Sequence, residues 1–195
     1  METLIFNTLD GAMVAVADLP NDVNLTKRQR ESIGAKNLFE KILNQNIEIA
    51  HDENGTPFLK DNTLKISISH SKTKIAVITH SQKNVGIDIE QISQKILRIA
   101  ERFLSKKELE KIQQSPENYT LAWAAKETAY KIIGKEATDF RASLEIQKIE
   151  KNNVEKTISL KFIKENKIFI FNYKILNNSV LVWGNDELIY KQNTS

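Results

Sequence analysis

The order of hydrophobic patterns is the feature that most limits what this chain can fold into. Apolar residues recur at helical spacing over Lys27–Leu43, and strand-like runs follow this stripe. The same order, a helix followed by strands, then appears a second time. The predicted strands are Ala12–Ala17, Lys65–Ser69, Lys74–Thr79, Asn84–Glu90, Leu144–Ile149, Val154–Phe162, Ile168–Ile175 and Ser179–Trp183. We therefore expect an α+β fold with two similar α/β halves, residues 1–84 and 85–195.

Capping signals place the helices of the second half. Ser105 with Glu108 three residues later is a capping box, which predicts a helix start. A second helix is expected to begin at Ser115-Pro116 and to end at Gly134, because proline is favoured in the first turn and glycine just past the last.

Composition excludes several classes of protein. The chain has no cysteine, so disulfides, thiolate nucleophiles and cysteine-based zinc sites are ruled out. With 28 basic and 25 acidic residues the net charge is only +3, too weak to predict a nucleic-acid partner. Apolar runs of membrane-spanning length and a recognisable signal peptide are both lacking, so we expect a cytoplasmic protein without membrane contact. A P-loop and a zinc-protease helix motif are also missing.

Two carboxylates stand out on the predicted strand Asn84–Glu90. Asp88 and Glu90 project to one face, while Ile87 and Ile89 project to the other and are expected in the core. Neighbouring carboxylates repel each other unless a cation lies between them, and Mg²⁺ binds such oxygen ligands. The alternative is a solvated edge face, where paired acids are common.

Trp123, Glu127 and Lys131 are spaced by four residues and share one helix face. A Glu–Lys pair at this spacing is a routine surface feature. A tryptophan in the same stripe prefers burial, however, so the stripe also fits the wall of a cleft.

Ser69-His70 ends a predicted strand. A hydroxyl, an imidazole and backbone amides at such a turn can bind a phosphate, although a simple polar turn has the same composition.

Taken in order, Ser-His after a strand, Gly-Ile-Asp-Ile-Glu over 86–90 and Trp-x-x-Lys-Glu-x-x-x-Lys over 123–131 resemble the 4′-phosphopantetheinyl transferases, specifically the larger surfactin-synthetase-activating (Sfp-like) class. The resemblance implies a pseudo-dimeric fold. It also implies transfer of 4′-phosphopantetheine from coenzyme A to a serine of an acyl or peptidyl carrier protein, with Mg²⁺ and release of adenosine 3′,5′-bisphosphate.

The resemblance assigns roles to the acidic residues and to two lysines. Asp88, Glu90 and Glu127 would bind Mg²⁺, and Glu127 would also be the general base. Lys131 and Lys126 would face the pyrophosphate, with Lys131 the stronger candidate.

The remaining coenzyme contacts fall mainly in the first half, which would therefore be the coenzyme-contacting half. They are Ser69 and His70, the turn residues Gly55 and Pro57, and the basic residues Lys27, Arg28 and Lys36. Two departures from the family pattern weaken the adenosine and phosphate contacts: Thr56 replaces a lysine, and Lys36 stands where an arginine is expected.

Gln91–Leu104 combines basic and apolar residues. It is either a docking surface for an acidic carrier protein or an ordinary amphipathic helix packed on the core. The docking surface would belong to the second half, together with the metal site.

Two rival functions remain, an idle coenzyme- or carrier-binding module of the same fold and a nucleic-acid binder. The intact acidic residues argue against the first and the scattered aromatic residues against the second. Two fused halves favour a monomer.

Overall fold

The two long helices begin and end where their capping residues predict. The computed structural model describes residues 3–151 and 156–187. In it α1 (Lys27–Leu43) follows Thr26, whose hydroxyl accepts a hydrogen bond from the backbone amide of Gln29. The helix α4 (Pro116–Ile133) follows Ser115 and ends at Gly134, whose φ of 81° lies in the left-handed region. Local capping therefore fixes the helices that carry most of the site.

The shorter helices all lie between residues 92 and 144, in the second half of the chain. The predicted capping box at Ser105 is confirmed, because its hydroxyl accepts from the Glu108 amide and the Glu108 carboxylate accepts from the Ser105 amide. The helices are α2 (Lys95–Ile99), the 3-10 helix η1 (Ala100–Arg102), α3 (Lys106–Lys111), the 3-10 helix η2 (Lys135–Ala137) and α5 (Phe140–Ser143).

The strands form two main antiparallel sheets and one small hairpin. One sheet has the order β1-β2-β6-β5, the other has the order β7-β11-β10-β9-β8, and β3 pairs with β4. The strands are β1 (Thr3–Asn7), β2 (Met13–Asp18), β3 (Ile49–His51), β4 (Pro57–Leu59), β5 (Lys65–His70), β6 (Lys74–His80), β7 (Val85–Gln91), β8 (Leu144–Lys151), β9 (Lys156–Phe162), β10 (Lys167–Leu176) and β11 (Ser179–Asn185). Val154, the start of one predicted strand, lies outside the described residues.

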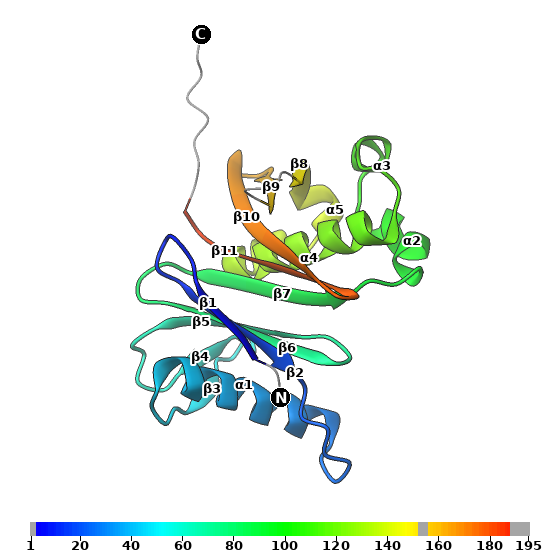
Figure 1. Ribbon diagram of the computed structural model, residues 1–195. Helices are drawn as coiled ribbons and strands as arrows, with labels where there is room; N and C mark the ends of the chain where they lie inside the picture. Colours follow the sequence, from blue (N-terminus) through cyan, green and yellow to red (C-terminus); the bar gives the residue numbers. More distant parts are fainter. Residues whose placement is uncertain (1–2, 152–155, 188–195) are drawn as a thin grey trace.

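The sheets and long helices stack as four layers, with α1 on the outside of one sheet and α4 on the outside of the other (Figure 1). Between the sheets, Val14, Val16 and Ile78 of the first pack against Ile87, Ile89 and Leu181 of the second. The prediction that Ile87 and Ile89 point into the core is therefore confirmed. Asp88 and Glu90, which alternate with them, lie on the opposite face, toward α4.

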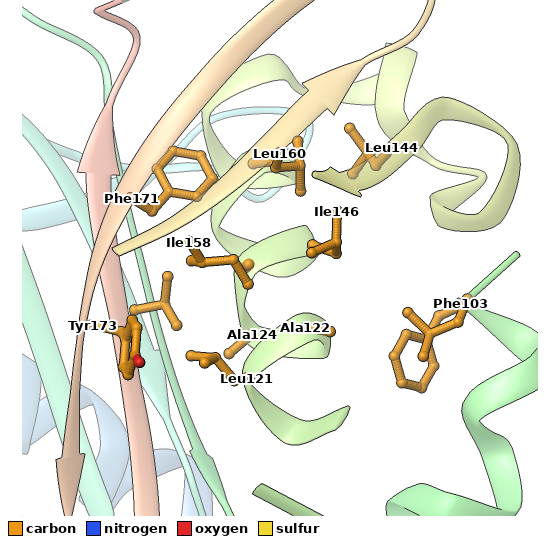
Figure 2. Close-up of a cluster of buried hydrophobic side chains, with 14 of the residues drawn as sticks. Phe103, Leu121, Ala122, Ala124, Leu144, Ile146, Ile158, Leu160, Phe171 and Tyr173 are labelled. Carbon is orange, nitrogen blue, oxygen red and sulfur yellow. The ribbon is translucent and has the colours of Figure 1, made fainter. Parts of the chain in front are cut away.

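The core of the second half lies between α4 and its sheet (Figure 2). Leu121, Ala122 and Ala124 of α4 are fully buried against side chains such as Ile158 and Phe171 from the strands. Because α4 buries this face in the core, its position relative to β7 is fixed by packing.

The mixed α/β architecture agrees with the predicted fold class. Each half contains a strand, then a long helix, and ends with a pair of strands: β2, α1, β5 and β6 in the first, β7, α4, β10 and β11 in the second. In both sheets the last strand of the half lies between the other two, in the orders β2-β6-β5 and β7-β11-β10. A pseudo-dimeric relation between the halves stays a prediction. No helix in the described part of the chain is long and apolar enough to cross a membrane.

Candidate functional site

Gly86 lets α4 lie directly against β7. A Cβ atom at this position would lie 2.3 Å from the carbonyl oxygen of Thr128, far closer than atoms normally approach. The glycine of the Gly-Ile-Asp motif is therefore needed because helix and strand backbones nearly touch here. This close packing brings the stripe on α4 to the carboxylates of β7.

Asp88 lies at the meeting point of three elements. Its Oδ1 accepts a 2.7 Å hydrogen bond from the Ser69 hydroxyl on β5 and a 2.9 Å bond from Lys131 Nζ on α4. Lys131 Nζ also donates to the carbonyl oxygen of Ile87, at 2.7 Å. Asp88 is only 4% exposed, so these partners compensate a buried negative charge.

Serine hydroxyls hold β5 beside the free edge of β7. The backbone amides of Ile87 and Ile89 donate to the hydroxyls of Ser67 and Ser69, at 3.3 and 3.2 Å. The edge amides of β7 are thus satisfied by side chains instead of a neighbouring strand. Ser69 both fixes β7 and donates to Asp88, so the Ser-His and Gly-Ile-Asp motifs meet directly.

Glu90 is held by the tryptophan of the third motif. The indole Nε1 of Trp123 donates a 3.0 Å hydrogen bond to Glu90 Oε1. Burial, followed by the nearby charge of Asp88, raises the pKa of Glu90 to about 7, although the indole hydrogen bond opposes this rise. The ionised form of Glu90 is therefore destabilised by its surroundings in the metal-free protein.

Glu127 belongs to the same group of interacting acids. Burial and the charge of Asp88 raise its pKa, while the ammonium group of Lys131 lowers it. The pKa of Glu90 is raised by the charge of Glu127 as well. The negative charges of Asp88, Glu90 and Glu127 thus disfavour one another in the metal-free protein.

The stripe on α4 runs between two cavities. Trp123 and Glu127 line one of about 670 Å³, together with Phe103, Phe140 and the exposed Arg102. Lys131 lines a different cavity of about 470 Å³, which it shares with Pro57 of the first half. The prediction that this helix face borders a cleft is therefore confirmed.

Three of the residues predicted to contact the coenzyme, Lys27, Lys36 and His70, pair with acidic residues of α1. Glu31 Oε1 lies 3.1 Å from His70 Nδ1 and 3.4 Å from Lys27 Nζ, so those two residues share an acidic partner. Lys36 pairs instead with Glu40 of its own helix, at 3.5 Å, and is largely exposed. Arg28 is exposed on α1, and Gly55 is an exposed turn glycine with a φ of 82°.

Lys126 does not face the site, contrary to the sequence prediction. Its side chain is fully buried, and its Nζ donates to the carbonyl oxygens of Phe103, Phe140 and Leu144 at 2.7, 3.1 and 2.7 Å. It also pairs with the buried Glu108, at 2.7 Å. Every donor of this ammonium is used inside the protein, which leaves none for a pyrophosphate.

Sequence reasoning missed two charged residues of α1. Glu31 binds His70, as described above, and Arg30 has a buried Nε that finds no hydrogen-bond partner among the described residues. An i, i+4 pattern does not reveal which charged positions turn inward, because most charged helix residues face solvent. A buried guanidinium nitrogen without a partner is a good position for an anion contact.

The carboxylate oxygens of Asp88, Glu90 and Glu127 are of the chemical type that binds a divalent cation. Asp88 Oδ2 is buried and has no hydrogen-bond partner within residues 3–151 and 156–187, and an oxygen left in this way suits a hard cation. In the same ranges no group of three or more His, Asp or Glu side chains is already arranged to hold a metal ion. The assignment of Mg²⁺ to Asp88, Glu90 and Glu127 therefore stays a prediction.

The segment Gln91–Leu104 divides its residues between the core and solvent. Phe103 and Leu104 are buried, and Ile92, Ile96 and Leu97 pack partly against the same core. Lys95, Arg98 and Arg102 are exposed on the outer side. The apolar half of the predicted docking surface is thus largely used for packing, which leaves mainly its basic half available to a partner.

Comparison with known proteins finds two similarities. The family model of the "4'-phosphopantetheinyl transferase superfamily" matches residues 84–181, half of the chain. A stretch of 99 residues is 37% identical to the protein named "4'-phosphopantetheinyl transferase gsp" from Aneurinibacillus migulanus. That match covers 48% of this chain and 41% of the relative, so the similarity spans less than half of either protein.

Proposed function

The chain belongs to the 4′-phosphopantetheinyl transferase superfamily, and from this premise we propose that it transfers 4′-phosphopantetheine from coenzyme A to a serine of an apo carrier protein. The observation that best supports the proposal is the contact of three motifs at one carboxylate. Asp88 accepts from Ser69 and from Lys131, which are separated from it by 19 and 43 positions. Residues so far apart in the sequence meet at one carboxylate, which supports a shared role in the proposed reaction.

In the proposed reaction the serine oxygen of the carrier attacks the β-phosphorus of coenzyme A. The bond from this phosphorus to the bridging oxygen breaks, and adenosine 3′,5′-bisphosphate leaves with that oxygen. Glu127 takes the serine proton, and its raised pKa makes it a stronger base than an ordinary carboxylate. Lys131 faces the developing negative charge of the leaving group, because it is a partly exposed cation beside the cavity that it shares with Pro57.

Asp88, Glu90 and Glu127 are the residues that would hold Mg²⁺. When bound, the ion would supply positive charge for the pyrophosphate. This chain's own residues do the rest of the positioning: Ser69 and Lys131 orient Asp88, and Trp123 orients Glu90.

The two cavities separate the substrates in this proposal. Coenzyme A would lie in the cavity between the halves, with Pro57 on the side of the 1–84 half and Lys131 on the side of the 85–195 half. His70 and Arg30 would contact its phosphates in place of Lys36, which is exposed and pairs with Glu40. The carrier serine would approach from the cavity that Glu127 and Trp123 line, next to the basic side chains of α2 and η1. A monomer in the cytoplasm remains our expectation.

Mass spectrometry of an apo carrier protein incubated with coenzyme A and Mg²⁺ tests the proposal. The wild-type protein should add one phosphopantetheine to the carrier, whereas Asp88→Ala and Glu127→Gln should not. Glu110→Gln is a matched control, because Glu110 is an exposed acid on α3. Absence of any mass gain across several apo carriers would overturn the proposal. If coenzyme A still bound to the protein, that result would favour the idle binding module.

A further inference from the structure

The ammonium group of Lys126 ties together the segments that surround Trp123. Its Nζ donates to the carbonyl oxygen of Phe103, which follows η1, and to that of Phe140, the first residue of α5. Phe103 and Phe140 are separated from Lys126 by 23 and 14 positions in the sequence. A fully buried cation with four protein acceptors is a rigid junction.

The rings of Phe103 and Phe140 both pack against the indole of Trp123. The ring of Phe103 lies 5.1 Å from the ring of Trp123 at an angle of 72°, and the ring of Phe140 lies 5.5 Å from it at 52°. The first pair is edge-to-face and the second is tilted, and centroid distances of this size are favourable for aromatic pairs. The position of the indole therefore depends on where Lys126 holds the backbones of Phe103 and Phe140.

The indole in turn fixes one of the site carboxylates. Its Nε1 donates to Glu90 Oε1 at 3.0 Å. One continuous set of contacts thus leads from Lys126 through two phenylalanines and Trp123 to Glu90. In metal centres such outer partners orient the ligands, and their loss weakens metal binding roughly 10–100-fold.

We propose that Lys126 is a positioning residue for the metal site, which acts on Glu90 by holding Phe103 and Phe140 against Trp123. This inference rests on the proposed function. It gives Lys126 a role that does not require contact with the coenzyme.

The Glu108 carboxylate keeps Lys126 in place from the other side. Glu108 accepts from the backbone amides of Ser105 and Ile146, both at 2.8 Å, in addition to its ion pair with Lys126. The junction is therefore anchored on α3 and β8 as well, so the ammonium cannot turn toward another partner without breaking several bonds.

A calorimetric titration of Mg²⁺ into the coenzyme-A-loaded protein, without any carrier, tests this inference. We expect Trp123→Phe, which keeps an aromatic ring but loses the N–H donor, to weaken Mg²⁺ binding by about 10-fold or more. Lys126→Met should weaken it as well. The double variant should bind Mg²⁺ no more weakly than Trp123→Phe alone, because both changes act on the same hydrogen bond.

Coenzyme A binding in EDTA supplies a readout that separates positioning from general damage. It should change by less than about twofold in these variants, whereas a loosened fold would weaken coenzyme and metal binding together. Lys111→Met, at an exposed lysine of α3, is the matched control and should bind Mg²⁺ like the wild type. If Lys126→Met does not fold, Phe140→Leu takes its place, because it removes one of the two rings that hold the indole.

A Mg²⁺ affinity within about twofold of the wild type in either Trp123→Phe or Lys126→Met would overturn the inference. Fully additive losses in the double variant would overturn it too. These outcomes differ from failure of the proposed function, which would appear as a wild-type protein that binds Mg²⁺ and coenzyme A but modifies no carrier.

Discussion

The hydroxyl of Ser69 donates a 2.7 Å hydrogen bond to Asp88 Oδ1, across a gap of 19 residues in the sequence. Ser69 thereby stabilises a carboxylate that is almost completely buried. The Ser-His motif contributes to the acidic site itself, in addition to any contact that it makes with a coenzyme phosphate.

Ser69→Ala should lower the free energy of unfolding by about 1.5–3 kcal/mol, because a hydrogen bond to a buried charged group is lost. Urea denaturation measures this change. Ser67→Ala is the matched control: its hydroxyl also accepts a β7 amide but has no carboxylate partner among its hydrogen bonds in the described chain, so we expect a smaller loss. Equal losses in the two variants would contradict the importance of the Ser69–Asp88 bond.

Gly86→Ala should destabilise the protein and disturb the site together. The added methyl group would meet the Thr128 carbonyl oxygen at 2.3 Å, so α4 must move away from β7. Overpacking of this kind costs about 1–3 kcal/mol or more. Because Lys131 is carried on α4, its contact with Asp88 should loosen as well. Thermal unfolding and the phosphopantetheine transfer rate check the two effects, and a variant with wild-type stability would show that the backbones are not in close contact.

The sequence predicted the parts of this structure that depend on neighbouring residues. The bounds of α1 follow from the helical spacing of its apolar residues, those of α4 follow from Ser115 and Gly134, and the faces of β7 follow from strand alternation. The edge strand β1 was missed, since Leu4 and Ile5 are exposed and give no clear alternation.

Side-chain direction was harder to predict than secondary structure. Lys126 and Glu127 are adjacent in the motif, yet Lys126 is fully buried whereas Glu127 lines a cavity. Helical spacing shows which residues share a face, but the segments that cover each face come from distant parts of the chain. Phe103, Phe140 and Leu144, which bind Lys126, could not be identified from the motif alone.

Stability of the metal-free protein should depend on pH through Glu90. Its pKa is raised from 4.5 to about 7 in the folded state, so the folded protein binds this proton more tightly than the unfolded chain. The stability that this proton contributes is complete below about pH 4.5 and is lost as the pH rises through about 7. The loss should be about 1–3 kcal/mol.

Glu90→Gln isolates this contribution from those of the other carboxylates. Glu127, whose pKa is also raised, titrates with the same sign, whereas acids such as Glu48 and Glu145, whose pKa is lowered, titrate with the opposite sign. Chemical denaturation in EDTA at about pH 5 and about pH 8 should show that the wild type loses more stability with rising pH than the variant. The same pH dependence in both proteins would mean that Glu90 is not strained by burial and by Asp88.

Glu108→Ala should be among the most destabilising single changes in this chain. It leaves the ammonium of Lys126 buried without its counter-ion and removes the acceptor for two backbone amides. Removal of one partner from a buried ion pair costs about 3–5 kcal/mol. Guanidinium denaturation measures the loss. Glu110→Ala, two positions along the same helix and exposed, should lie within about 0.5 kcal/mol of the wild type.

A crystal structure with coenzyme A and Mg²⁺ bound tests the central claim most directly. We predict that each carboxylate of Asp88, Glu90 and Glu127 either binds one ion directly, at about 2.1 Å, or accepts a hydrogen bond from a water molecule on that ion, and that the same ion contacts the pyrophosphate. Carboxylates that remain separated by more than about 10 Å, with the ion elsewhere on the coenzyme, would contradict it, since a six-coordinate ion cannot bridge that distance.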